Sequence, residues 1–259
     1  YTLLFLLGKT TPKVQAIAAA VVLGGYWAAF ALYPLPPSGF DYAQVGVPPG
    51  WQHLQGFAAH WDKNTNIAAY FDVGFLNLFP REKPFAYNGG GYLALSFVPS
   101  LGTMIFGLLA GGWLKGGRPA AEKTWKLVVA GLLALAVGQA LGALGICPVV
   151  KRIWTPSWAV FSTGWTCLFL AFFYGVLDWK SQRGWAFPLI VVGMNSITMY
   201  CMAHLIDHFV ASSLKTHVGQ GIFEVFGAVY SPIVQSAVVL FILWCICLWM
   251  HRRKIFLRI

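Results

Sequence analysis

The stretch SPIVQSAVVLFILWCICLWM, which fills residues 231–250, decides the fold class. It contains no Asp, Glu, Lys or Arg, and its length matches the roughly 20 residues that an α-helix needs to cross about 30 Å of hydrocarbon. Because every backbone N–H and C=O in lipid must be paired, such a run indicates a transmembrane helix. Comparable apolar runs occupy residues 14–33, 94–114, 125–146, 158–177 and 185–210.

The composition of the whole chain agrees with these runs. Of the 259 residues, 58% are hydrophobic and 10% are charged, and the mean hydropathy is +0.66. A water-soluble domain of this length carries far more charge. We therefore predict an all-α fold, a polytopic membrane helix bundle with about six transmembrane helices in this chain. The net charge of +10 is expected to lie beside membrane lipid, and no nucleic-acid partner is expected.

The basic residues predict the orientation, since Lys and Arg accumulate in short loops on the cytoplasmic side. If successive connections between the spans lie on alternate sides of the membrane, 12 of the 18 Lys and Arg residues fall on one side. They are Lys9, Lys13, Lys115, Arg118, Lys123, Lys126, Lys180, Arg183, Arg252, Arg253, Lys254 and Arg258. The other side holds Lys63, Arg81, Lys83, Lys151, Arg152 and Lys215. We therefore predict a multi-pass cell-membrane protein with a cytoplasmic C-terminus and a long outer loop at residues 34–93.

The outer loop at 34–93 is the one part of the chain with the composition of a soluble segment. A connection of this length is usually functional or ordered against the bundle. Within it, residues 66–79 are expected to form an amphipathic stretch that lies on the membrane surface or caps a cavity. At the start of the chain, the apolar stub 2–7 is too short to span a membrane. It resembles the tail of a preceding helix, so we expect part of the fold to lie upstream of Tyr1.

Polar side chains cluster in the span 185–210, although an unpaired polar group is costly in lipid. Ser196, Tyr200, His204 and His208 recur at every fourth residue, which predicts one polar stripe along a helix. Two interpretations are open: the stripe lines a cavity that opens outward, or its members bond neighbouring helices. In the first, His204 is the candidate catalytic residue, because an imidazole exchanges protons near neutral pH.

Cations and tryptophans gather just before the span 158–177. Lys151 and Trp154 are expected near the outer mouth of the cavity. A belt of tryptophans with snorkelling cations at the membrane interface explains the same residues.

Small residues inside the spans predict packing rather than chemistry. The five cysteines show neither a disulfide framework nor a zinc pattern, so no metal site is expected. Gly107 and Gly111, and likewise Gly138 and Gly142, have the GxxxG spacing that lets helix backbones approach closely. This spacing favours a packed bundle and allows a homodimer.

Several motifs together resemble a known family. They are Gly193-Met194-Asn195-Ser196-Ile197 with Tyr200 and His204 after it, Trp154-Thr155-Pro156-Ser157, Phe106-Gly107-Leu108-Leu109-Ala110-Gly111, and the closing string Arg253-Lys254-Ile255-Phe256-Leu257-Arg258-Ile259. In these elements the chain resembles the heparan-α-glucosaminide N-acetyltransferase family, in particular its bacterial membrane homologues. The resemblance covers essentially the whole chain.

The resemblance implies an acyltransferase fold of about eleven spans, with residues 1–259 as the C-terminal part of one transmembrane acyltransferase-like domain. Members of the family use cytoplasmic acetyl-CoA to acetylate the amine of a terminal glucosamine across the membrane. The family's catalytic histidine lies in the first outer loop, which would fall upstream of Tyr1. By resemblance, the cavity for acetyl-CoA and acceptor is lined by Asn195, Ser196, Tyr200 and His204, with Lys151 and Trp154 near its outer mouth.

One motif departs from the family. Lysosomal members carry an acidic Asp-Pro-Glu-Gly turn where this chain has Asn88-Gly89-Gly90-Gly91, which removes two potential amine-binding carboxylates. The resemblance therefore implies a bacterial amino sugar as the acceptor, a place in the bacterial inner membrane, and a periplasmic position for 34–93. On the cytoplasmic side, positive charge suggests a site for the phosphates of acetyl-CoA at Lys115, Arg118, Lys123 and Lys126. The general excess of Lys and Arg in cytoplasmic loops also explains these four residues.

The sequence is compatible with three functions. The leading hypothesis is an enzyme that moves an acetyl group from acetyl-CoA to an amino sugar on the outer side of the membrane. The alternative is a transporter or flippase for a sugar or lipid-linked sugar, which the polar stripe also favours. For a purely structural membrane protein, we expect that replacing Asn195 or His204 changes assembly and no activity.

Overall fold

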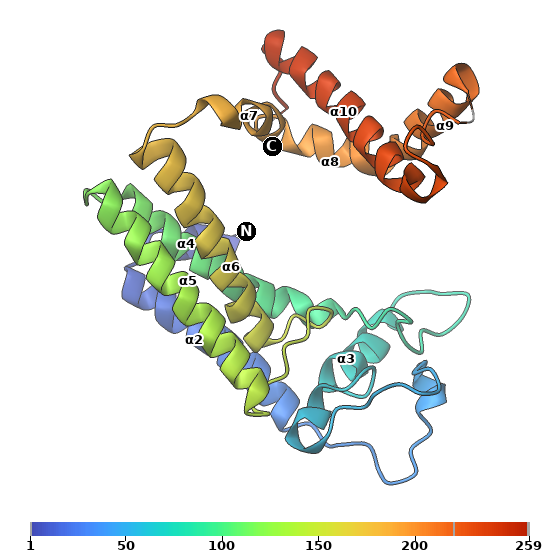
Figure 1. Ribbon diagram of the computed structural model, residues 1–259. Coiled ribbons are helices and arrows are strands. Elements are labelled where there is room, and N and C mark those ends of the chain that lie inside the picture. Colours follow the sequence, from blue (N-terminus) through green and yellow to red (C-terminus); the bar gives the residue numbers. More distant parts are fainter. Residues whose placement is uncertain (1, 220, 258–259) are drawn as a thin grey trace. The chain divides into compact units, whose positions relative to one another are not determined.

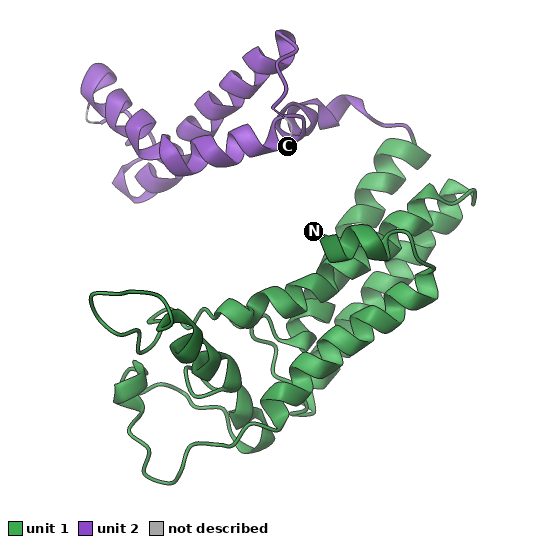
Figure 2. Ribbon diagram, turned by 180° about the vertical axis from the view of Figure 1, so that it is seen from behind, with its two compact units in different colours: residues 1–180 green, residues 181–259 purple. Residues whose placement is uncertain are grey.

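The computed structural model describes residues 2–219 and 221–257. All regular secondary structure within these ranges is helical, without a strand, which confirms the all-α class. The chain divides into two compact units, residues 1–180 (unit 1) and 181–259 (unit 2), coloured green and purple in Figure 2. Tyr1, and Arg258 and Ile259 of the closing string, lie outside the described residues.

Unit 1 contains a bundle of four long apolar helices, which Figure 1 shows side by side. They are α2 (Pro12–Ala31), α4 (Phe97–Lys115), α5 (Ala120–Ala143) and α6 (Pro156–Tyr174). The short helix α1 (Thr2–Leu7) comes first, a 3-10 turn, η3 (Ala94–Ser96), precedes α4, and a π-helical turn, η4 (Gly175–Trp179), extends α6. With these extensions, each long helix is long enough and apolar enough to cross a membrane. Their bounds lie within about five residues of the predicted spans.

Local sequence sets where two of these helices begin. The side-chain oxygen of Thr11 accepts a hydrogen bond from the Val14 amide (3.4 Å), and Thr155 does the same for the Trp158 amide (3.3 Å). A proline follows each threonine, at the first position of α2 and of α6. Proline suits this position because it lacks the N–H that a first turn leaves unpaired, while the threonine oxygen satisfies another.

Glycines bring α5 and α6 into close contact. A Cβ atom on Gly138 would lie 2.7 Å from the Phe161 Cβ, and one on Gly164 would lie 2.8 Å from the Gly131 oxygen. Such approach is the packing that GxxxG spacing favours in membranes. The pair Gly107 and Gly111 differs, since an added Cβ at either position would meet no atom within 4 Å.

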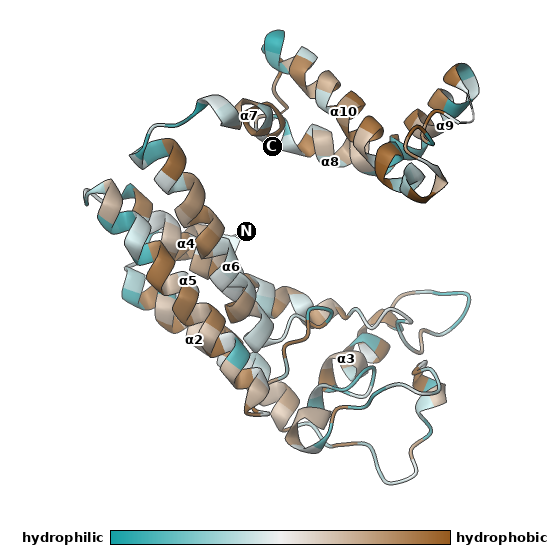
Figure 3. Ribbon diagram, viewed as in Figure 1, coloured by the Kyte–Doolittle hydropathy of each residue, from teal (hydrophilic) through white to brown (hydrophobic). Residues whose placement is uncertain are grey.

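The segment 34–93 is ordered against one end of the bundle, as expected for a connection of this length. It contains η1 (Tyr42–Val45), η2 (Gly56–Trp61) and α3 (Ile67–Leu76). Trp61 and Ala68 join Tyr26 and Phe30 of α2 in one hydrophobic core, where the Phe30 and Trp61 rings stack with centroids 6.0 Å apart. Figure 3 shows the contrast in hydropathy between the brown helices of the bundle and the paler and teal chain around α3.

Unit 2 contains α7 (Phe187–Gly193), α8 (Ser196–Leu205), α9 (Asp207–Val218) and α10 (Ser231–Arg252). Helix α10 is long and apolar enough to cross a membrane, while α7 and α8 reach this only as a pair bent by 68°. In the described part of the chain there are therefore five single candidate spans and a sixth in the bent pair. This number agrees with the predicted polytopic bundle of about six.

The segment 185–210 differs from the single helix that its sequence predicts. It breaks at Asn195 (φ −132°, ψ 40°) and again at Ile206 (φ −127°, ψ 1°). The Asn195 side chain donates to the Ile255 carbonyl and accepts from the Leu257 amide, both at 3.1 Å. An asparagine whose amide bonds a distant segment does not need the helical backbone around it, and this residue type competes with helix in any case. Residue spacing alone does not reveal such a break.

Candidate functional site

The polar stripe predicted for unit 2 is only partly formed. Ser196, Tyr200 and His204 share α8 and are exposed. The His204 Nδ1 lies 2.9 Å from the Tyr200 carbonyl oxygen, and the two rings lie 4.2 Å apart. His208 belongs to α9, beyond the break at Ile206, so the helix that would carry all four residues is interrupted.

A pocket of about 280 Å³ lies beside the start of α9. Asp207 and His208 line it together with Gln235 and Ser236 of α10. The predicted residues Ser196, Tyr200 and His204 are not among its lining residues. The Asp207 carboxylate, at the first residue of α9, accepts from the His208 amide at 2.6 Å.

Asn195 is fully buried in unit 2, and both ends of its amide are used in the two bonds to the closing string. These bonds fix the C-terminal chain against the break between α7 and α8. A role for Asn195 in lining a substrate cavity stays a prediction.

Lys151 and Trp154 lie in unit 1 and face different surroundings. Lys151 is exposed and lines a pocket of about 470 Å³ formed between the segment 34–93 and the loop before α6. Trp154 has a positive φ of 49°, and its indole N–H donates to the Thr103 hydroxyl of α4 at 3.2 Å. Trp154 is therefore anchored in the bundle, and Lys151 is the predicted residue that reaches a pocket.

A buried carboxylate, Asp62, forms one wall of this pocket. It is only 5% exposed, and one oxygen pairs with the His53 Nδ1. The other oxygen accepts hydrogen bonds from the Trp51 indole at 3.3 Å and from the Lys63 amide at 2.8 Å. These bonds pay for the burial of the charge and hold the His53 ring in one orientation.

Cations, tryptophans and apolar side chains form most of the rest of the pocket wall, the apolar ones being Leu54, Val149, Val150 and Ile153. Lys63 lies over the Trp51 ring at 4.8 Å, and Arg152 donates to the Gly90 carbonyl at 2.7 Å. With Lys151, these side chains make the charged part of the lining mostly positive, since Asp62 is its single carboxylate. Trp61 also lines the pocket, and its buried indole N–H has no hydrogen-bond partner among the described residues.

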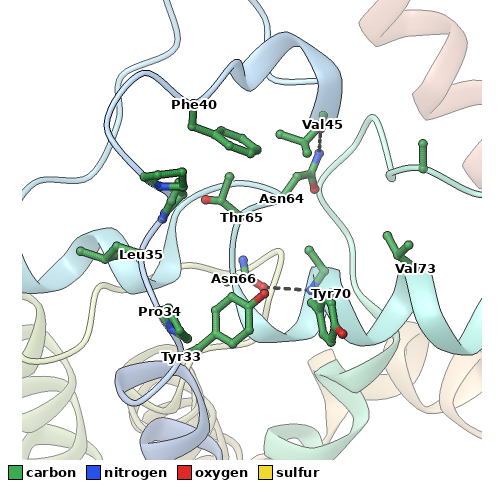
Figure 4. Close-up of a pocket in the computed structure, with 14 residues that line it drawn as sticks. Tyr33, Pro34, Leu35, Phe40, Val45, Asn64, Thr65, Asn66, Tyr70 and Val73 are labelled. Carbon is green, nitrogen blue, oxygen red and sulfur yellow. Dashed lines mark hydrogen bonds between the residues drawn. The ribbon is translucent and has the colours of Figure 1, made fainter.

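A second pocket, of about 360 Å³, is lined by Asn64, Thr65 and Asn66, which follow Asp62 and Lys63 of the first pocket in the chain (Figure 4). Its wall is aromatic and uncharged: Tyr33 and Tyr70 pack with ring centroids 6.0 Å apart, and Phe40 closes another side. Burial, together with the neighbouring Tyr70, raises the pKa of Tyr33, so its phenol keeps its proton at neutral pH. The pocket therefore offers neutral hydrogen-bonding groups between aromatic rings.

Asparagines shape the boundary between the two pockets. Asn64, with a positive φ of 58°, donates to the Val45 carbonyl (2.8 Å) and the Asn88 carbonyl (3.2 Å). Asn66 caps α3 through bonds to the amides of Ala68 and Ala69, both 3.1 Å. The Thr65 hydroxyl between them is buried and unbonded in the described part of the chain.

Sequence alone did not single out His53 and Asp62 as a pair. The signal present is that each follows a tryptophan closely in a polar loop, but no periodicity links two residues across irregular backbone. Metal binding is not indicated: the described residues contain no group of three or more His, Cys, Asp or Glu side chains placed to hold an ion.

Three of the four cations suggested for the phosphates of acetyl-CoA have partners within the protein. Lys123 donates to the Leu114 carbonyl at 2.8 Å, Arg118 pairs with Glu122, and Lys126 lies 4.7 Å from the centre of the Trp113 ring. These contacts close the turn between α4 and α5. They leave the phosphate site as a prediction from charge.

Comparison with protein-family models and with curated proteins finds no match for this chain. The fold defines its class: an all-helical, multi-pass membrane protein whose longest connection folds over one end of the bundle and encloses two adjoining pockets.

Proposed function

We propose that the protein is a membrane-bound acyltransferase that moves an acetyl group from cytoplasmic acetyl-CoA to an amino sugar on the outer side of the membrane. The family resemblance of its motifs supports this proposal. The structural observation that supports it most is the pair formed by the buried Asp62 and the partly exposed His53. Asp62 lines a pocket whose charged residues are mostly cations, and His53 lies next to this lining rather than in it. In this proposal, the pocket holds the acceptor sugar.

The Asp62–His53 pair is suited to act on the acceptor amine. A carboxylate bonded to Nδ1 keeps the proton on that nitrogen and leaves Nε2 free to accept another. His53 then removes a proton from the sugar ammonium, and the neutral amine attacks the thioester carbonyl. The C–S bond breaks, coenzyme A leaves as a thiol with the proton that His53 took up, and one further proton of the amine passes to water. The Trp51 ring, which is 37% exposed, offers an aromatic surface that suits a sugar ring.

The positive lining suits the same reaction. Nearby positive charges lower the pKa of an ammonium and so favour the amine that attacks. They also stabilise the negative charge that develops on the carbonyl oxygen during acyl transfer. Lys151 is the cation we expect to contribute most, because Arg152 and Lys63 already contact protein groups.

A transporter or flippase for a sugar or lipid-linked sugar is the second candidate. It is favoured by the 68° bend between α7 and α8, because helices interrupted within the membrane are typical of transporter binding sites. This function predicts movement of the sugar without any acetyl-CoA.

The test is acetyl transfer from labelled acetyl-CoA to glucosamine by the full-length protein in detergent. We expect His53→Ala to lower kcat/KM by about 10²–10⁴-fold, the range typical of a lost general base. His204→Ala and Asn195→Ala, measured in parallel, test the residues that the sequence suggested in unit 2.

The matched control is Gln44→Ala, an exposed residue of η1 outside both pockets. It should leave transfer unchanged, and all variants should unfold at similar temperatures. Transfer that depends on His204 and not on His53 would move the base to unit 2. If the folded protein acetylates no amino sugar but moves one across a vesicle membrane, the transporter is correct.

A further inference from the structure

Helix α3 has one face packed on the protein and, beside it, an aromatic face whose side chains are more than a third exposed. Ala68, Ala69 and Asp72 are buried against the end of the bundle. Phe71 and Phe75 are 38% and 41% exposed, and beyond the helix Leu78 and Phe79 are 77% and 55% exposed. We name Phe71, Phe75, Leu78 and Phe79 the aromatic face.

The three phenylalanines of the aromatic face form a continuous ladder. The Phe71 and Phe75 rings are stacked at 5.3 Å, and the Phe79 ring meets the Phe75 ring edge-on at 5.4 Å. A spacing of four residues places such rings along one side of a helix. No charged side chain interrupts the ladder, because the one charge within α3, Asp72, points into the protein.

A pair of hydrogen bonds fixes the position of α3 relative to the end of the helix bundle. Both carboxylate oxygens of Asp72 accept from the Ala94 amide, at 3.1 and 3.0 Å. Ala94 is the first residue of the candidate span Ala94–Lys115. Figure 1 accordingly shows α3 beyond the end of the bundle at which α2 ends and α4 begins. This is the level at which a span leaves the hydrocarbon and enters the headgroup region.

The chain after α3 brings cations back to the same place. The Asn77 side chain binds both backbone groups of Phe85, accepting from its amide at 2.7 Å and donating to its carbonyl at 2.9 Å. This closes a turn that carries Arg81 and Lys83 with Glu82 between them, a net charge of one positive, and Arg81 lies over the Phe85 ring at 5.4 Å. An apolar aromatic face flanked by cations is the pattern of helices that lie in a membrane interface.

We propose that α3 and the turn after it form an interfacial anchor, with the aromatic face inserted among phospholipids and Arg81 and Lys83 at the level of their phosphates. With 10 residues, α3 is about 15 Å long and cannot span the membrane, but it can lie along the surface. This inference is independent of the proposed acyltransferase activity. It fixes the depth in the membrane of the pocket lined by Tyr33 and Tyr70, since Asn66, which caps α3, and Tyr70 of α3 both line it.

The test uses a fluorescent NBD label at Leu78→Cys, in a full-length background where the more accessible cysteines, Cys201 and Cys245, are alanine. The protein is placed in phosphatidylcholine–phosphatidylglycerol nanodiscs. We expect blue-shifted emission and quenching by doxyl-labelled lipid at least about twofold greater than for a label at Gln44→Cys, an exposed site in η1.

A second variant separates insertion from mere proximity to lipid. In the labelled protein, Phe71→Gln with Phe75→Gln should reduce quenching by lipid toward the Gln44 value while the protein stays folded, since both side chains are exposed. Quenching by aqueous iodide instead of by lipid would overturn the proposal. So would a label shielded from both, which would indicate that another protein or a second copy covers the face.

Discussion

At the scale of single residues, the two buried aspartates of the segment 34–93 serve different purposes. Asp62 bonds to side chains at a pocket wall, whereas Asp72 bonds only to the backbone at the start of a span. Burial raises the pKa of the Asp72 carboxyl, and the hydrogen bond from Ala94 opposes that rise. Because the pKa is raised on folding, the contribution of Asp72 to stability should depend on pH.

We predict that Asp72→Ala lowers the free energy of unfolding by about 1–2 kcal/mol, because the Ala94 amide at the start of the candidate span loses its acceptor. Asp72→Asn keeps an acceptor oxygen without the charge, and should retain most of the stability. Thermal unfolding in detergent at pH 7 measures both. Equal melting temperatures for wild type and Asp72→Ala would show that the bond contributes nothing.

The raised pKa of Asp72 also predicts a pH dependence. Between its ordinary pKa and the higher folded value, the folded protein holds more protons than the unfolded chain. The stability contributed by this group is therefore complete below the ordinary aspartate pKa, and is lost as pH rises through the folded pKa. The melting temperature of wild type relative to Asp72→Asn should fall over that window and be constant above it.

Two threonines of the α6 region give a further prediction at this scale. The fully buried Thr155 hydroxyl oxygen accepts from the Val150 amide at 3.0 Å and from the Trp158 amide at 3.3 Å, so Thr155→Val strands two donors. We expect a loss of about 1–3 kcal/mol. Thr163 only donates to the Ala159 carbonyl of its own helix, so Thr163→Val should change stability by less than about 0.5 kcal/mol.

At the scale of elements, glycine spacing predicted close packing, and the structure confirms it for one of the two pairs. Gly138 lies against Phe161 of α6 and Gly142 lies against Val149. Gly107 and Gly111 touch nothing in the described chain, because a spacing shows which residues share a helix face but not what lies opposite. A homodimer through that free face stays a prediction.

We predict that Gly138→Ala destabilises the protein by about 1–3 kcal/mol, because its methyl group would overlap Phe161. Gly107→Ala is the control: it meets open space, and alanine favours helix by up to about 1 kcal/mol. Melting temperatures in the same detergent decide between them. A larger loss for Gly107→Ala would mean that the α4 face is covered in the assembled protein.

The bent pair α7–α8 shows, for a whole element, that a local sequence pattern does not reveal contacts with distant parts of the chain. Length and hydropathy of 185–210 predicted a span, and the pair does have the composition of one. The break at Asn195 depends on bonds to Ile255 and Leu257, some 60 positions further along the chain. Local patterns cannot contain that information, because helix propensity is decided within a few residues.

At the scale of the whole molecule, topology depends on whether the bent pair crosses the membrane. If it counts as one span, six crossings place the segment 34–93 and the C-terminus on opposite sides. If it enters and returns, five crossings place them on the same side, and the basic closing string would face outward, against the usual bias.

We therefore predict that a membrane-impermeant maleimide on intact cells labels Ser38→Cys and reaches Arg253→Cys only after the membrane is opened. Both positions are exposed in the structure. Labelling of both without permeabilisation would show that α7 and α8 form a re-entrant element. Labelling of Arg253→Cys alone would reverse the predicted orientation.

The candidate site could be predicted from sequence only in outline. Lys151 was expected near an outer mouth and does line a pocket, while Trp154, three positions away, turns into the bundle toward Thr103. His53 and Asp62 meet across irregular backbone, where no period relates one residue to the next. Whether Asn195, Ser196, Tyr200 or His204 contacts a substrate stays a prediction.

The sequence by itself determined the helical class, the approximate bounds of five spans and the presence of a long ordered connection. Hydropathy and run length are local properties, and lipid accepts few backbone structures other than helices, so these features can be read along the chain. The tertiary structure alone decided which side chains meet: Asp62 with His53, Asp72 with Ala94, and Asn195 with the closing string. Such contacts depend on how distant segments pack in three dimensions, and packing leaves no periodic signal in the sequence.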